Sequence, residues 1–113
     1  MTIYHPEAWV ALRMHNSKTD KTIYKIYAGW RGGFVDGDSW QLNSGIKSID
    51  TEQYEYHVHG YSGSIYVCRK NLEGLDRAGS YIRGVLDNML KNVPEHMEVS
   101  IVPMTEVKLD DGH

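Results

Sequence analysis

The segment 54–70 constrains the fold most strongly, because its residues alternate in character on both sides of a glycine-containing turn. It reads Tyr-Glu-Tyr-His-Val-His-Gly-Tyr-Ser-Gly-Ser-Ile-Tyr-Val-Cys-Arg-Lys. Alternation with a period of two is typical of a half-buried strand, and a turn between two such runs indicates a β-hairpin. We therefore predict an antiparallel hairpin with Ser62 and Gly63 as its two loop residues.

This register gives the hairpin two different faces. It pairs Tyr61 with Ser64 and places opposite charges together at Glu55 and Lys70, as cross-strand pairing favours. The predicted core face carries Tyr56, Val58, Ile65 and Val67. The predicted opposite face carries Glu55, His57, His59, Tyr61, Tyr66, Cys68 and Lys70. A shift of one residue would mix the two faces, so the pattern supports this register.

Further strands are predicted on both sides of the hairpin. Alternation indicates strands over 8–15 and 22–30, and the Asp36-Gly37 pair is a strong signal for a hairpin turn before a strand near Trp40. Residues 46–49 can extend this set of strands. A last strand is expected over 98–107, where Pro103 marks an edge strand or an early end.

A change of period after the hairpin predicts one helix. Apolar residues recur at helical spacing in a stripe formed by Leu75, Ala78, Ile82, Val85, Leu86, Met89 and Val93. Pro94 should end this helix at about Asn92 or Val93. The expected fold is α+β in a single domain over 1–113. It has an antiparallel meander of about five to six strands with one helix packed on one face, and then a final strand.

A helix on one face would leave the other face of the sheet open. The predicted open face carries His57, His59, Tyr61, Tyr66, Trp9, Arg13 and Tyr27. The chain has eight tyrosines and three tryptophans but one phenylalanine, and such rings suit a surface that is apolar yet in contact with water. This face could stack a flat ligand, contact a protein or pair with a second copy. It could equally be a solvated face without a partner.

Metal binding or hydrolysis is the alternative for the same segment. His57 and His59 would lie about 7 Å apart on one side of a strand, and with Cys68 opposite they could hold zinc. Cys68 and His57 could also form a nucleophile and base. The run Gly60 to Ser64 partly resembles a nucleophile elbow, but it lacks the last glycine and the strand-to-helix turn. A hairpin turn explains these glycines better, so we predict no cofactor and no enzymatic activity.

Charge and composition exclude several classes of function. The chain has 113 residues, with 12 basic and 15 acidic side chains and a net charge of −3, which argues against general nucleic-acid binding. No apolar run approaches the roughly 20 residues that a membrane helix needs. A single cysteine and the lack of a signal peptide at the N-terminus predict a cytoplasmic protein.

Two segments resemble stretches of known proteins. The runs Gly37 to Gly45 and His59 to Cys68 are similar to those of small, mostly uncharacterised bacteriophage accessory proteins. The resemblance covers about half of the chain and includes no catalytic motif. It implies a viral protein in the host cytoplasm, where such proteins often block or sequester a host component, including parts of immune systems.

The predicted function is therefore a non-enzymatic binder that acts by occupancy, with components of host defence among its expected targets. Its partner would be a host protein or a small nucleotide-like ligand. A structural phage subunit is the remaining alternative, and a homodimer or higher oligomer is compatible with either reading.

Overall fold

The computed structural model describes residues 1–32 and 37–109. In chain order the described elements are β1 (Ile3–Tyr4), β2 (Ala8–Asn16), β3 (Lys21–Trp30), β4 (Ser39–Leu42), β5 (Ile46–Thr51), β6 (Glu55–Gly60), β7 (Ile65–Arg69), a 3-10 turn (Lys70–Leu72), α2 (Ser80–Lys91), β8 (Met97–Val102) and a second 3-10 turn (Met104–Glu106). The predicted Asp36-Gly37 turn lies partly outside the described residues.

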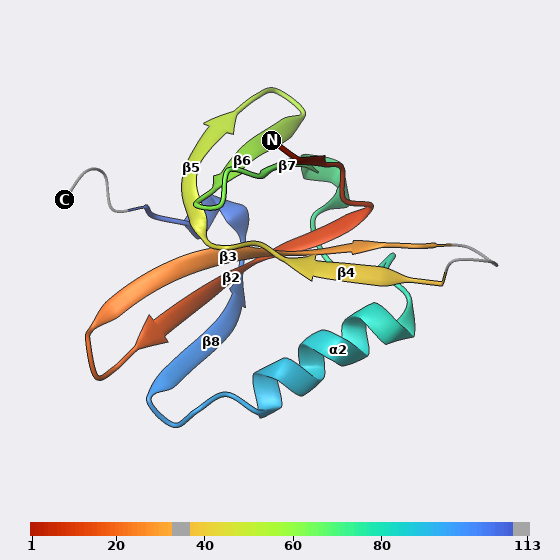
Figure 1. Ribbon diagram of the computed structural model, residues 1–113. Helices are drawn as coiled ribbons and strands as arrows, with labels where there is room; N and C mark the ends of the chain where they lie inside the picture. The colour runs from red at the N-terminus through yellow and green to blue at the C-terminus, as the bar shows by residue number, and fades with distance from the viewer. Residues whose placement is uncertain (33–36, 110–113) are drawn as a thin grey trace.

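The strands form two stacked sheets, and the helix makes a third layer (Figure 1). Sheet A has the order β1-β7-β6-β5 and sheet B the order β4-β3-β2-β8. Neighbouring strands are antiparallel, except that β1 runs parallel to β7. The predicted α+β class is confirmed. The prediction of a single sheet was wrong, because β5, β6 and β7 lie over sheet B instead of extending it.

The larger core lies between the two sheets. Sheet B contributes Trp9, Ala11, Tyr24, Ile26 and Ala28, and sheet A contributes Ile46, Val58, Tyr66 and Cys68. Trp9 is fully buried, and its Nε1 donates a hydrogen bond of 2.8 Å to the carbonyl of Arg69 at the end of β7. This contact satisfies the one polar atom of the ring and links the two sheets.

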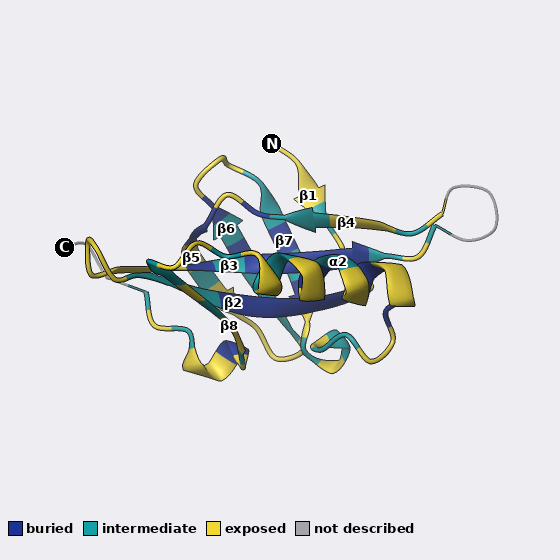
Figure 2. Cartoon of the chain, turned by 90° about the horizontal axis from the view of Figure 1, so that it is seen from below, coloured by how far each residue is buried: buried dark blue, intermediate teal, exposed yellow. Residues whose placement is uncertain are grey.

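The smaller core lies between sheet B and α2. The buried residues here are Ala8, Val10, Leu12, Tyr27, Ala78, Ile82 and Leu86. Figure 2 shows β2 buried over most of its length behind the helix, whose outer side is exposed. Gly29 allows this close packing, because a Cβ there would lie only 2.9 Å from the Ile82 side chain. Sheet B is thus covered on both faces, which is why five consecutive residues of β2 are buried.

The central hairpin adopts a register one residue away from the predicted one. Gly60 and Ser64 close the turn through a hydrogen bond of 2.9 Å, so the loop has the three residues Tyr61, Ser62 and Gly63. Gly63 has φ +94°, the left-handed conformation that three-residue hairpin loops use and that glycine adopts without strain. As a result β6 and β7 pair as Glu55 with Arg69, Tyr56 with Cys68, His57 with Val67, Val58 with Tyr66, and His59 with Ile65.

The helix and the last strand end close to the positions predicted from the sequence. α2 ends at Lys91, and Asn92 forms its C-cap, two residues before Pro94. Among the described residues, β8 pairs with β2 alone. It ends immediately before Pro103, so the predicted edge strand is confirmed but is shorter than expected.

Asn43 marks the point where the chain passes from sheet B to sheet A. Its backbone N–H donates to the carbonyl of Ile26 at 3.0 Å, and its side-chain Oδ1 accepts from the N–H of Ile26 at 2.9 Å. The side-chain oxygen thus replaces the backbone carbonyl that a longer β4 would offer to β3. The chain can therefore turn away at Ser44 and Gly45 without leaving the buried N–H of Ile26 unpaired.

Candidate functional site

The candidate site is the outer face of sheet A, which is the side of the sheet that points away from sheet B. Alternation along the paired strands places Ile3, Ser48, Asp50, Glu55, His57, His59, Ile65, Val67 and Arg69 on this face. We refer to these residues as the outer face. These residues are exposed or half-buried.

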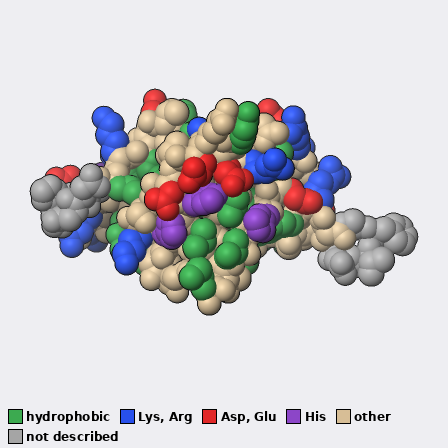
Figure 3. Space-filling model, turned by 90° about the horizontal axis from the view of Figure 1, so that it is seen from above, with side chains coloured by type: hydrophobic (Ala, Val, Ile, Leu, Met, Phe, Trp, Pro, Cys, Tyr) green, Lys and Arg blue, Asp and Glu red, His purple; other side chains and the backbone are tan. Residues whose placement is uncertain are grey.

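Two imidazoles at the centre of the outer face are each held by a carboxylate. His57 Nε2 lies 2.9 Å from Glu55 Oε1, and His59 Nε2 lies 3.0 Å from Asp50 Oδ2. The hydrogen bond to Glu55 raises the pKa of His57 above its ordinary value, against a smaller lowering by burial. Figure 3 shows histidines in the middle of this face with a group of acidic side chains beside them.

The β1 and β7 side of the outer face is mainly apolar, and it also carries one exposed cation, Arg69. Ile3 is 54% exposed, and Ile65 and Val67 are half-buried. Ile65 pairs with Ile3 on one side and with His59 on the other, so apolar and imidazole groups are direct neighbours across the strands. The outer face therefore changes from mainly apolar, with Arg69, at β1 and β7, through the histidines and Glu55 of β6, to acidic at Asp50 of β5.

Several residues of the predicted open face lie in the cores instead. Trp9 and Tyr66 are buried between the sheets, and Tyr27 is buried under α2, where its hydroxyl donates to the Ile82 carbonyl at 2.7 Å. Burial raises the pKa of Tyr27 and of Tyr66 to about 12. The predicted aromatic face was therefore wrong. Stacking a second sheet on sheet B buried Trp9, and the three-residue loop turned Tyr66 inward.

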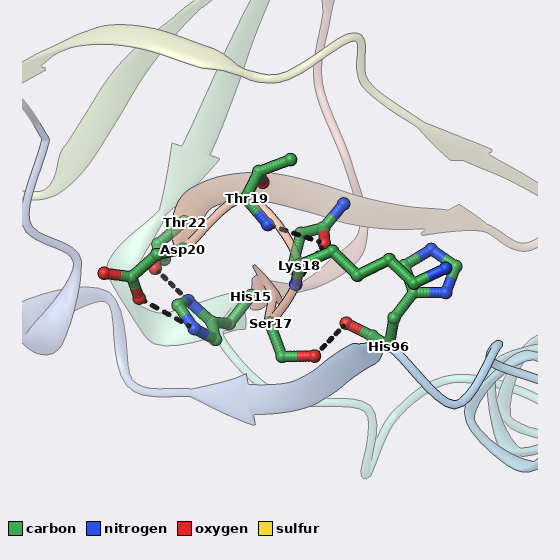
Figure 4. Close-up of polar contacts among 8 residues, drawn as sticks. His15, Ser17, Lys18, Thr19, Asp20, Thr22 and His96 are labelled. Atoms are coloured by element: carbon green, nitrogen blue, oxygen red, sulfur yellow. Dashed lines mark hydrogen bonds and ion pairs between the residues drawn. The ribbon is translucent and has the colours of Figure 1, made fainter.

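Arg13 lies on the half-buried end of β2, on the same side of sheet B as Trp9. It therefore does not join His57 and His59. His15 lies further along β2 at the β2–β3 turn, where its Nδ1 is 2.8 Å from Thr22 Oγ1 and its Nε2 is 3.4 Å from Asp20 Oδ1 (Figure 4). These contacts stabilise the turn and do not extend the outer face.

The proposed metal ligands are separated by the sheet itself. Cys68 faces the core and is fully buried, whereas His57 and His59 face outward. Burial also raises the pKa of the Cys68 thiol far above its ordinary range, which disfavours the thiolate that metal binding or nucleophilic attack requires. The alternative of a zinc site formed by His57, His59 and Cys68 is therefore contradicted by the fold, because Cys68 lies on the opposite side of the sheet from both histidines. Within residues 1–32 and 37–109, no group of three or more histidine, cysteine or acidic side chains could hold a metal ion.

Tyr61 remains exposed, at the corner next to the outer face. Its side chain is 67% exposed and its ring lies over Gly45, where an added Cβ would be 3.1 Å from Tyr61 Cδ2. The loop is fixed to the crossover by two hydrogen bonds, from the Tyr61 N–H to the Gly45 carbonyl at 3.2 Å and from the Ser62 N–H to Ser44 Oγ at 2.9 Å. Tyr61 is thus an exposed ring on a well-anchored loop.

A groove of about 590 Å³ begins beside Tyr61. Its lining includes three lysines, Lys21, Lys47 and Lys108, together with Asp20 and the buried Tyr24. The sequence alone did not indicate this groove, because its residues come from four separate segments that only the fold brings together.

Comparison with family models, with curated proteins and with solved structures gives no match for this chain. No helix in the described part of the chain is long and apolar enough to cross a membrane.

Proposed function

We propose that this protein is a non-enzymatic protein-binding module that acts by occupying a partner through the outer face of sheet A. The observation that carries the proposal is the uncovered sheet surface on which exposed Ile3 and half-buried Val67 adjoin the His57–Glu55 and His59–Asp50 pairs. An apolar area bordered by fixed polar groups is the usual composition of a protein–protein interface.

Charge indicates the chemistry of the partner. Three carboxylates, Asp50, Glu52 and Glu55, lie close enough to His57 to raise its pKa. They outnumber the one cation of the outer face, Arg69, and the chain carries a net charge of −3. We therefore infer a partner surface with an apolar centre and a basic border, because complementary potentials favour association. The carboxylates would repel a phosphate group, so this face suits a protein better than a nucleotide.

Binding is favoured over catalysis by the contacts of the imidazoles. The hydrogen-bonded partners of His57 and His59 are carboxylates, and in the described part of the chain no serine, threonine or cysteine side chain is bonded to either ring. Neither imidazole is therefore placed to activate a side-chain nucleophile. The viral origin and a host protein as the partner stay predictions from the resemblance.

Affinity capture with matched variants tests this proposal. Ile3→Lys combined with Val67→Lys places two cations in the apolar half of the outer face, whereas Ile23→Lys changes a residue of similar exposure, 45%, on sheet B. We expect immobilised wild type and Ile23→Lys to retain a common protein from bacterial lysate, and the double variant to lose it. The captured protein, once purified, should bind wild type directly. Equal retention by all three folded proteins would refute the assignment of this face.

The groove beside Tyr61 supports a second candidate function, the binding of a small anionic planar ligand such as a nucleotide. Lys21, Lys47 and Lys108 can neutralise phosphate, and the exposed ring of Tyr61 can stack on a base. Calorimetric titration with nucleoside phosphates tests it, with Tyr61→Ala compared against Tyr54→Ala, whose ring is 69% exposed elsewhere. Binding that is lost only in Tyr61→Ala supports this candidate, and absence of heat with wild type excludes it.

A further inference from the structure

The strand β8 leaves one side of sheet B open. It pairs with β2 on one side, and in the described part of the chain no strand pairs with its other side. Its sequence Met-Glu-Val-Ser-Ile-Val has one charged residue, Glu98, and no lysine or proline before Pro103. Edge strands of soluble proteins usually carry such residues, or a bulge, to prevent pairing with another chain. β8 therefore presents a nearly unprotected template for a further strand.

An apolar groove lies next to this edge. Pairing of Leu12 with Ile101 and of Met14 with Val99 places both β8 side chains on the helix side of sheet B. α2 does not reach over them, since Ile101 is 49% exposed. The groove has a volume of about 420 Å³, and its apolar lining includes Met14, Leu86, Met89, Leu90, Val93 and Val99. A strand added to β8 would thus also need an apolar layer on its helix side.

We propose that β8 pairs antiparallel with β8 of a second copy of this chain across a two-fold axis. A free strand edge is completed by a strand, and the groove beside it is completed by apolar side chains. This chain supplies both, because β8 is itself an edge strand and carries Met97, Val99 and Ile101 on its helix side. The two copies of sheet B then form one continuous sheet of eight strands, with the two α2 helices on the same side. Such an interface is self-complementary, as two-fold symmetry requires.

The distribution of charge selects a register for this pairing. With Val99 opposite Val99 of the second copy, Met97 lies opposite Ile101 and Glu98 lies opposite Ser100. The apolar residues of both strands then form one uninterrupted strip on the helix side, and the two Glu98 carboxylates do not face each other. Ser100 pairs with Arg13 on β2, so each Glu98 is directed toward a cation of the other copy.

Sedimentation equilibrium of the full chain over a range of concentrations tests the proposal. We expect wild type to give an apparent mass of twice the monomer mass of 12.9 kDa. Ile101→Lys should shift the equilibrium to monomer by at least tenfold in dissociation constant, while circular dichroism confirms the fold. Ile3→Lys is the matched control, because Ile3 is similarly exposed but lies on the outer face of sheet A. It should leave the dimer unchanged.

A mixing experiment tests the register. Met97→Glu and Ile101→Lys should each weaken the dimer when studied alone. In a mixture, the new glutamate of one chain lies opposite the new lysine of the other, so a heterodimer should form at concentrations at which each variant is monomeric. Wild type that stays monomeric at the highest concentration reached would overturn the proposal. Loss of the dimer in Ile3→Lys instead of Ile101→Lys would also overturn it, and would place the contact on sheet A.

Discussion

We expect the side chain of Asn43 to contribute much more to the free energy of unfolding than an ordinary polar side chain does. Asn43 is 4% exposed, and its Oδ1 accepts from the N–H of Ile26 at 2.9 Å and from the N–H of Gly45 at 3.3 Å. Replacement by alanine removes the acceptor and leaves these backbone donors without their partner at the crossover between the sheets. Little of the loss can be recovered by pairing with another strand, because the chain turns away from β3 at this point.

The expected magnitude follows from the two hydrogen bonds. A buried donor that loses its partner costs about 1–3 kcal/mol, with the longer bond to Gly45 at the lower end. Asn43→Ala also removes the Nδ2 group, which is buried without a partner, and this recovers part of the cost. We expect a net loss of roughly 2–4 kcal/mol in the free energy of unfolding. An unfolding entropy of about 2.1 cal/mol/K per residue then implies a fall in Tm of roughly 8–17 °C.

Urea unfolding followed by tryptophan fluorescence, together with calorimetry, would measure this loss. Asn88→Ala is the matched control, because Asn88 is exposed on α2 and should change stability by less than about 0.5 kcal/mol. A change for Asn43→Ala that equals the change for Asn88→Ala would refute the reasoning. It would mean that the Ile26 N–H gains another partner, and that the side-chain oxygen does not hold the crossover.

Three further predictions concern single groups. Cys68 should react with a thiol reagent only when the protein unfolds, because burial raises the pKa of its thiol; rapid labelling of the native protein would contradict this. Tyr27→Phe should lose about 1 kcal/mol in urea unfolding through the missing hydrogen bond to Ile82, and an unchanged midpoint would argue against that bond. His57 should titrate by NMR with a midpoint above its ordinary 6.5, and Glu55→Gln should lower the midpoint. Because this pKa is raised on folding, the contribution of the His57–Glu55 pair to stability is complete below pH 6.5 and is lost as pH rises through the folded pKa of His57. Identical midpoints in wild type and Glu55→Gln would contradict the pairing.

The strand periods could be predicted from the sequence, but the stacking of the sheets could not be predicted from period alone. Alternation places Trp9 and Val10 on opposite sides of β2 whether the second hairpin lies beside sheet B or over it. A clue to the second arrangement was nevertheless present, since residues 8–12 are all apolar. An uninterrupted apolar run is typical of a strand buried on both faces, and the fold confirms that interpretation for β2.

His57 and His59 point outward as predicted, whereas Tyr66 and Cys68 point inward, because the two strands depend on the loop in different ways. His57 and His59 alternate with the core residue Val58 along β6, so their outward direction follows from that strand alone. The direction of Tyr66 and Cys68 depends on how many residues form the loop. Choosing two loop residues instead of three reversed both of them, although the pattern of charges at Glu55 appeared to support the choice.

The hairpin loop and the crossover also explain why two distant segments are rich in glycine, serine and asparagine. Residues 43–45 and 61–63 meet at one corner, where Ser44 Oγ accepts from Ser62 and the Tyr61 ring covers Gly45, whose φ is +127°. Small side chains and positive φ are required here because one segment turns away from sheet B where the other reverses sheet A. Most of the unusual composition near the hairpin is therefore accounted for by folding. What folding does not account for is the exposed combination of Tyr61, Ile3 and the two carboxylate-bound histidines, and this is the surface for which we propose binding.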